Sequence, residues 1–171
     1  DPWTVRDPGG LVESYAVLFQ RLGGTVAIGD ASTLREAGSG WAVETAAGTV
    51  SAANAVLALG PWAGDVTRQL GYRLPLFVKR GYHREYRALA DGTLNHPALD
   101  AEMGYLLAPM RRGVRLTTGV EFARRDALPN EMQIEGTEAI ARELLHFGER
   151  LDPQPWIGAR PATPDMKPII G

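Results

Sequence analysis

The side chain best placed to do chemistry in this sequence is an arginine in a proline-bounded segment, Gly158-Ala159-Arg160-Pro161. A guanidinium presents two parallel donors that match a carboxylate, so Arg160 is a candidate clamp for an acidic group of a substrate. The competing interpretation is that Arg160 stiffens a proline-rich turn by donating to backbone carbonyls. On spacing alone the two interpretations are equally good.

Two further side chains are candidates because they lie on predicted strands. The Tyr105 hydroxyl can donate one hydrogen bond to a bound carboxylate, although most strand tyrosines pack the sheet. His83, which follows Tyr82, can contact a substrate or can occupy the polar face of the sheet. For these residues the residue types alone favour packing.

Several kinds of chemistry are not expected. The chain has no cysteine and only three histidines, which are scattered at His83, His96 and His146, so we predict neither a thiol nucleophile nor a metal site. No Gly-x-Gly-x-x-Gly follows a predicted strand, so nothing here cradles a pyrophosphate. No catalytic acid or base pair stands out, and we assign no catalytic residue.

The charge balance excludes another class of partner. The 171 residues include 18 basic and 20 acidic ones, and the arginines form short clusters instead of a continuous stripe. We therefore expect no nucleic-acid binding. There is no run of 18 apolar residues, which together with the absence of cysteine favours a cytoplasmic protein.

The first half of the chain alternates helices and strands. Apolar residues at helical spacing follow Asp7 and stop at Gly23-Gly24, which predicts a helix that buries one stripe. Three short strand-like runs then predict a meander, and a continuously apolar run predicts a strand buried on both faces that leads into a short helix. These segments are residues 25–28, 33–37 and 41–45, the strand at 55–59 and the helix at 62–70.

The second half is dominated by long strands. We expect one strand over residues 74–86, a hairpin formed by 105–108 and 114–122, and a helix over 137–147. Residues 152–171 contain five prolines, so they should be extended. The predicted fold class is α+β (mixed α/β), in which an antiparallel sheet with flanking helices joins part of an α/β domain that is incomplete at both ends.

Three stretches resemble a known family, the FAD-dependent D-amino-acid dehydrogenase, glycine oxidase and sarcosine oxidase group. Residues 49–63 are similar to its strand, polar link and apolar strand closing with Ala-x-Gly before a tryptophan. Leu74-Pro75-Leu76 with Arg80-Gly81-Tyr82 is similar to the return strand into the substrate lobe. Residues 158–165, followed by Pro168-Ile169-Ile170-Gly171, resemble Gly-x-Arg-Pro-x-Thr-Pro-Asp-x-x-Pro-x-Ile-Gly, the most specific of the three.

The resemblance implies an internal fragment with three parts. Residues 1–73 would belong to the FAD-binding domain, 74–157 to the substrate-binding domain, and 158–171 would return to the FAD-binding domain. The Gly-rich unit that binds the FAD pyrophosphate in the family has no counterpart here. We therefore expect FAD in the parent protein but not tight retention by this chain.

The resemblance also implies site residues. Arg160 matches the family arginine that holds the substrate carboxylate, and Tyr105 matches a tyrosine that helps hold the same group, with His83 nearby. The residues expected beside FAD are Ser32, Ala58, Leu59, Gly60 and Trp62. Gly60 makes physical sense because a side chain there would obstruct close approach of the cofactor, although a glycine that only ends a strand is nearly as good.

The activity that the resemblance implies is oxidation of the C–N bond of an amino acid by hydride transfer to flavin N5. One alternative is a related enzyme acting on glycine, N-methyl amino acids or other amines. Another is a binding module that never held a flavin. Expected partners are a small amino acid or amine substrate, a membrane surface or electron acceptor touching the parent, and a second copy of the chain through exposed sheet edges.

Overall fold

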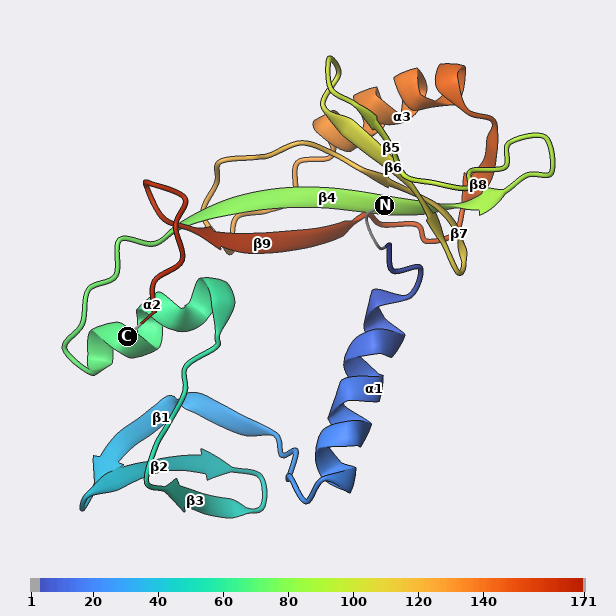
Figure 1. Cartoon of the computed structure of the whole chain (residues 1–171). Helices are drawn as coiled ribbons and strands as arrows, with labels where there is room; N and C mark the ends of the chain where they lie inside the picture. The colour runs from blue at the N-terminus through green and yellow to red at the C-terminus, as the bar shows by residue number, and fades with distance from the viewer. Residues whose placement is uncertain (1–3, 171) are drawn as a thin grey trace. The chain divides into compact units, whose positions relative to one another are not determined.

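The computed structural model describes residues 4–170, so Gly171, the last position of the family motif, lies outside the described residues. It is a mixed α/β protein with antiparallel sheets, which confirms the predicted fold class (Figure 1). The chain divides into two compact units, one of residues 1–11 and 78–160 and the other of residues 12–77 and 161–171. Within residues 4–170, no helix is long and apolar enough to span a bilayer.

The first helix, α1 (Pro8–Arg21), begins and ends where the sequence predicts. The Asp7 carboxylate accepts a hydrogen bond from the Gly10 amide at 3.1 Å, which caps the first turn. Gly23 ends the helix with φ 93°, a conformation that favours glycine. The predicted buried stripe is wrong: Tyr15 and Leu22 are 64% and 78% exposed, because none of the described residues covers that side of α1.

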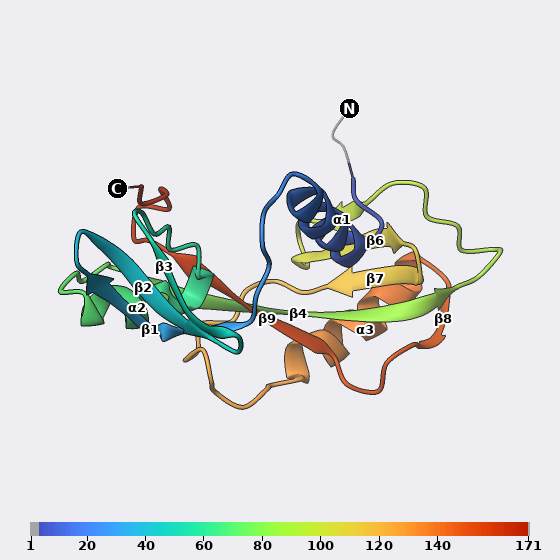
Figure 2. The ribbon, with the colours of Figure 1, turned by 90° about the horizontal axis from the view of Figure 1, so that it is seen from below.

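A three-stranded antiparallel meander follows in the order β1-β2-β3, and Figure 2 shows the three strands side by side. Two predicted strands are absent. Residues 25–28 and 55–59 form no strand, because an apolar run becomes one only where a neighbour pairs with it, and no described strand does so. The meander strands are β1 (Gly29–Ala37), β2 (Gly40–Thr45) and β3 (Gly48–Ala52).

The short helix predicted after residue 61 is present. A single 3₁₀ turn at Gly60–Trp62 leads into α2 (Ala63–Gln69), and Gly71 follows with φ 88°. Gly60 itself has φ 54°, so the turn into this helix requires glycine at that position.

The second sheet is built around β4 (Phe77–Ala88), the long strand that the sequence predicts. Its strand order is β5-β6-β7-β4-β8, and β9 also pairs with β4. The predicted hairpin forms with Arg111 and Arg112 in its turn. The other strands are β5 (Ala98–Asp100), β6 (Tyr105–Met110), β7 (Gly113–Thr117), β8 (Phe147–Arg150) and β9 (Trp156–Ala162).

The last helix, α3 (Met132–Leu144), starts five residues earlier than predicted and ends before Phe147. Leu145 has extended backbone angles, φ −140° and ψ 129°, which end the helix. Phe147 then starts β8 instead, because its ring is buried against Tyr86 with the ring centroids 4.6 Å apart.

Side chains of β4 alternate between two faces of the sheet. Tyr82, Arg84 and Tyr86 point to the side covered by α3, where they join a core that includes Leu116 and Ile134. The residues between them point to the opposite face. One strand therefore contributes both to the core and to a surface free of α3.

The buried charges on the core side are matched. The Glu138 carboxylate of α3 accepts hydrogen bonds from Tyr86 at 2.7 Å and from Arg142 at 2.9 Å, and it forms an ion pair with Arg150 at 2.9 Å. Arg84 lies 3.4 Å from the same carboxylate. Burial opposes ionisation, but these partners outweigh it and lower the pKa of Glu138 to about 2.

Arg80 performs a different task at the start of β4. Its guanidinium donates to the carbonyls of Ala127 and Leu128 at 2.5 and 3.1 Å and forms an ion pair with Glu121. It also donates to the Tyr82 hydroxyl, which accepts the Asn130 amide hydrogen bond. The long connection between β7 and α3 is thereby fixed to the sheet.

Candidate functional site

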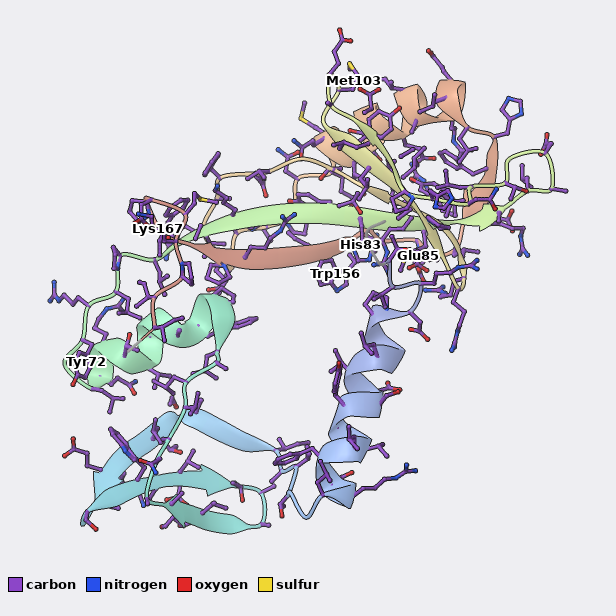
Figure 3. The ribbon with its side chains drawn as sticks, in the orientation of Figure 1. Tyr72, His83, Glu85, Met103, Trp156 and Lys167 are labelled. Carbon is purple, nitrogen blue, oxygen red and sulfur yellow. The ribbon has the colours of Figure 1, made fainter. Side chains whose placement is uncertain are left out.

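The face of β4 that lacks α3 gathers the first group of candidate residues. The His83 and Trp156 rings are stacked, with centroids 4.6 Å apart and planes 18° from parallel. Figure 3 shows both side chains, together with Glu85, on the side of β4 away from α3. Because side chains two apart on a strand share a face, Trp156, Gly158 and Arg160 of β9 lie on this same side.

Arg160 reaches over β4 at a glycine. A Cβ atom at Gly81 would lie only 3.1 Å from Arg160 Nη2, so the absence of a side chain at position 81 leaves room for the guanidinium. Arg160 is exposed, and no carboxylate of the described residues pairs with it. The charge on this face is therefore available to a ligand.

His83 is held neutral by its surroundings. Burial, followed by the positive charge of Arg115, lowers its pKa to about 4, and Glu85 and Asp152 oppose this shift. A neutral imidazole stacked on an indole can accept or donate a hydrogen bond without adding a second positive charge beside Arg160.

Tyr105 is not brought to this face. Its register in β6 places it on the same side as Leu107 and Leu116, in the core, where it is 2% exposed. Burial and the neighbouring Asp100 carboxylate raise the pKa of its hydroxyl. Arg160 and His83 thus share the open face of the sheet, whereas Tyr105 lies on the opposite face, in the core.

A cavity of about 540 Å³ opens beside the stacked rings. Its wall combines aromatic surface with two ion pairs. Arg112 binds Asp152 through two hydrogen bonds of 3.0 and 3.1 Å, and Arg115 binds Glu85 through bonds of 2.6 and 3.1 Å. The lining is completed by Arg84, Gln154 and Pro155.

The other unit contains a cavity of about 480 Å³ that includes Gly60. The open space beside Gly60 shows no atom within 4 Å of where a Cβ would lie. Thr67 borders this cavity, and its Oγ1 atom is buried with no hydrogen-bond partner among the described residues. Thr163 and Lys167, from the segment after Arg160, line it too. An unsatisfied hydroxyl and a nearby ammonium suit a ligand rich in hydrogen-bond acceptors, as FAD is.

The remaining predicted cofactor residues lie elsewhere in this unit. Ser32 is exposed on β1, where its amide and hydroxyl both donate to the Asp30 carboxylate. Leu59 borders a separate apolar cavity next to the meander. Ala58 is exposed, and Trp62 is 54% exposed. Among the five residues predicted to lie beside FAD, Gly60 is the one that lines the same cavity as Thr67.

Sequence reasoning missed several residues of these cavities. Trp156, which is 59% exposed and stacks on His83, was not among the predicted site residues. Its spacing of four from Arg160 was the available signal, since it puts both residues on one face of a strand. Glu85 is two residues from His83 and carries the same signal. Nothing in the sequence pointed to Thr67.

The family model described as FAD dependent oxidoreductase matches residues 1–171. The chain therefore belongs to this family, whose members depend on FAD.

Curated relatives agree with this assignment. The chain is 32% identical over 133 residues to glycine oxidase of Pseudomonas aeruginosa, covering 75% of this chain and 35% of the relative. It is 34% identical over 175 residues to D-amino acid dehydrogenase of Methylobacterium radiotolerans, covering 93% and 39%. The chain thus spans less than half the length of these relatives.

Solved structures show the same fold. Glycine oxidase of Geobacillus kaustophilus matches with a TM-score of 0.64 and 23% identity, covering 83% of this chain and 38% of that protein. L-proline dehydrogenase of P. horikoshii matches with a TM-score of 0.69 and 18% identity, covering 96% and 46%.

Proposed function

We propose that the chain is part of an FAD-dependent enzyme that oxidises the C–N bond of an amino acid in the manner of a D-amino-acid dehydrogenase. The observation that carries the proposal is the exposed Arg160, which has no carboxylate partner among the described residues and lies on the same sheet face as His83. In this assignment residues 1–73 belong to the FAD-binding domain, 74–157 to the substrate-binding domain, and 158–171 return to the FAD-binding domain.

Arg160 would bind the carboxylate of the substrate through two charge-assisted hydrogen bonds, which fixes the position of the adjacent carbon. Gly81 supports this role because it leaves the guanidinium room to lie over β4. The neutral imidazole of His83 would contact the amine or side chain and would add no positive charge there. If the substrate binds with its amine unprotonated, no side chain is required as a general base.

FAD would lie against Gly60, Thr67, Thr163 and Lys167. The buried Thr67 hydroxyl would gain an acceptor, and the Lys167 ammonium would lie near a negatively charged or carbonyl group. When bound, FAD supplies an acceptor for the hydride of the substrate carbon, which leaves an imine that water hydrolyses.

Replacing Arg160 tests the substrate assignment. In the flavin-loaded parent protein, Arg160→Gln should raise the KM for an amino acid by roughly 10- to 100-fold, because each charge-assisted hydrogen bond contributes about 1.5–3 kcal/mol. Oxidation of an amine without a carboxylate should not change. Arg87→Gln is the matched control, since Arg87 is exposed on β4 and already paired with Glu149. Equal KM values for Arg160→Gln and the parent would refute the assignment.

The glycine-oxidase relative gives weight to the alternative of a glycine or N-methyl amino acid oxidase. The cavity beside His83 and Trp156 supports substrates with a side chain, because glycine has nothing to place there. Comparing the rates of flavin reduction by glycine, sarcosine and larger amino acids separates the two. A parent protein that lacks flavin absorption would instead indicate a non-catalytic binding module.

The isolated chain should bind FAD weakly, because no Gly-rich pyrophosphate turn occurs in its sequence. Isothermal titration that shows tight FAD binding by these 171 residues would contradict this expectation. Three further expectations remain predictions. Size-exclusion chromatography tests self-association of the chain. Cell fractionation tests a cytoplasmic location and contact of the parent protein with a membrane surface or electron acceptor.

A further inference from the structure

The cavity beside the stacked rings has a buried carboxylate in its wall, and only one of the two carboxylate oxygens accepts hydrogen bonds from the described residues. Glu85 is 6% exposed, and both of its hydrogen bonds from Arg115 go to one oxygen, Oε1. The second oxygen, Oε2, is buried and accepts no hydrogen bond from residues 4–170. The Arg112 guanidinium lies 3.5 Å from Oε2, which is an ion-pair contact but too long for a strong hydrogen bond.

An unsatisfied buried oxygen in a cavity wall favours a ligand that donates a hydrogen bond there. The formal charge of the wall limits what that donor is. Arg84 also lines the cavity, but its guanidinium pairs with Glu131 and Glu138 on the core side of the sheet. The charged groups that face the cavity are Glu85 and Asp152 with Arg115 and Arg112, and their charges sum to zero. A cation would approach two guanidinium groups, and an anion would approach two carboxylates. An uncharged donor avoids both repulsions.

The same wall also offers a donor beside this acceptor. Arg112 is 54% exposed at its side chain, and its Nη1 atom faces both Glu85 and Asp152. A primary carboxamide has an NH₂ group and a carbonyl oxygen side by side, so it can donate to Glu85 Oε2 while it accepts from Arg112. The aliphatic atoms that precede the amide would pack on Trp156, which is 59% exposed.

We propose that the cavity beside His83 and Trp156 binds an uncharged carboxamide at the end of a substrate side chain. Its NH₂ group donates a hydrogen bond to Glu85, and its carbonyl oxygen accepts one from Arg112. The assignment of this group to a substrate rests on the proposed function. Along β4 the pocket lies toward Glu85 and Arg160 lies over Gly81, four residues or roughly 13 Å away along the strand. That separation suits an amino acid whose carboxylate binds Arg160 while its extended side chain reaches the pocket.

Three ligands of equal length test the chemistry directly on this chain: propionamide, propionate and propylammonium. The readout is the NMR signal of the His83 imidazole, with His96 and His146 as internal references outside the cavity. Propionamide should shift the His83 signal with a Kd on the order of 10 mM, as expected for a ligand of five heavy atoms. Propionate and propylammonium should shift it at least tenfold less at the same concentration.

Adjacent arginines provide the matched variants. Arg112→Ala should abolish the propionamide shift, whereas Arg111→Ala should leave it unchanged, because Arg111 is 79% exposed, pairs with Asp7 and does not line the cavity. Both side chains are exposed enough that folding should survive. An equal response to all three ligands, a stronger response to either ion, no response at all, or a full response in Arg112→Ala would each overturn the proposal.

The outcome is separable from the test of the proposed function. If propionamide binds as expected but the flavin-loaded parent oxidises no amino acid, the carboxamide selectivity of the cavity is supported and the proposed function is refuted. If the parent oxidises amino acids but the cavity discriminates against the amide, the carboxamide assignment is refuted and the proposed function is unaffected.

Discussion

The charge network around Glu138 gives the sharpest prediction about stability. Glu138→Gln keeps the size of the side chain but removes the charge that faces Arg84, whose side chain is 0% exposed. Lowering a carboxyl pKa from 4.5 to about 2 corresponds to about 3 kcal/mol of folding free energy at neutral pH. Removing one partner of a buried ion pair typically costs about 3–5 kcal/mol. Glu131 also contacts Arg84, at 2.9 Å, so we expect a loss near 3 kcal/mol.

Urea denaturation followed by circular dichroism measures this loss. The pKa of Glu138 is depressed in the folded state, so its stabilising effect is present above pH 4.5 and is lost as the pH falls toward 2. The free-energy gap between the original chain and Glu138→Gln should therefore shrink over that range. Glu149→Gln, which breaks an exposed pair with Arg87, is the control and should change little. A gap below about 1 kcal/mol at neutral pH, or one that does not change with pH, would refute the reasoning.

Two further predictions concern a histidine and a pair of glycines. The His83 imidazole should titrate near pH 4 by NMR. Because its pKa is lower in the folded state than in the unfolded state, lowering the pH from 6.5 toward 4 should destabilise the fold. A titration midpoint at or above 6.5 would contradict the argument that burial lowers this pKa. Gly113→Ala should destabilise the chain by more than about 2 kcal/mol, because φ is 152° and a Cβ would clash with the Tyr86 carbonyl oxygen. Gly64→Ala in α2 meets nothing within 4 Å and should instead stabilise by about 0.5–1 kcal/mol, so urea midpoints that move in the same direction for both variants would count against this account.

The sequence predicted elements well where a local pattern determines them. The hairpin of β6 and β7, the long strand β4 and the glycine stop after α1 all follow from turn residues and periodicity. The failures lie where pairing decides. Residues 25–28 and 55–59 have strand composition, yet backbone groups form a strand only against a neighbouring chain segment, which periodicity does not reveal.

The candidate site shows the same division. Arg160 was predicted as a site residue from its motif, and the structure leaves its guanidinium exposed on the open sheet face. Tyr105 was misplaced because its face depends on the register of β6 with β7, which the sequence does not give. His83 and Trp156 lie on two strands that are distant in the chain, so their stacking could not be predicted from the sequence.

The alternation of side chains between the two faces of β4 has a consequence for the evolution of such a protein. Positions 82, 84 and 86 help to maintain the folded state, while positions 81, 83 and 85 border the places where ligands are expected. His83 and Glu85 of the second set point away from the core that α3 covers. Substitutions on one face of β4 can therefore change ligand preference during evolution, while the residues on the other face maintain the folded structure.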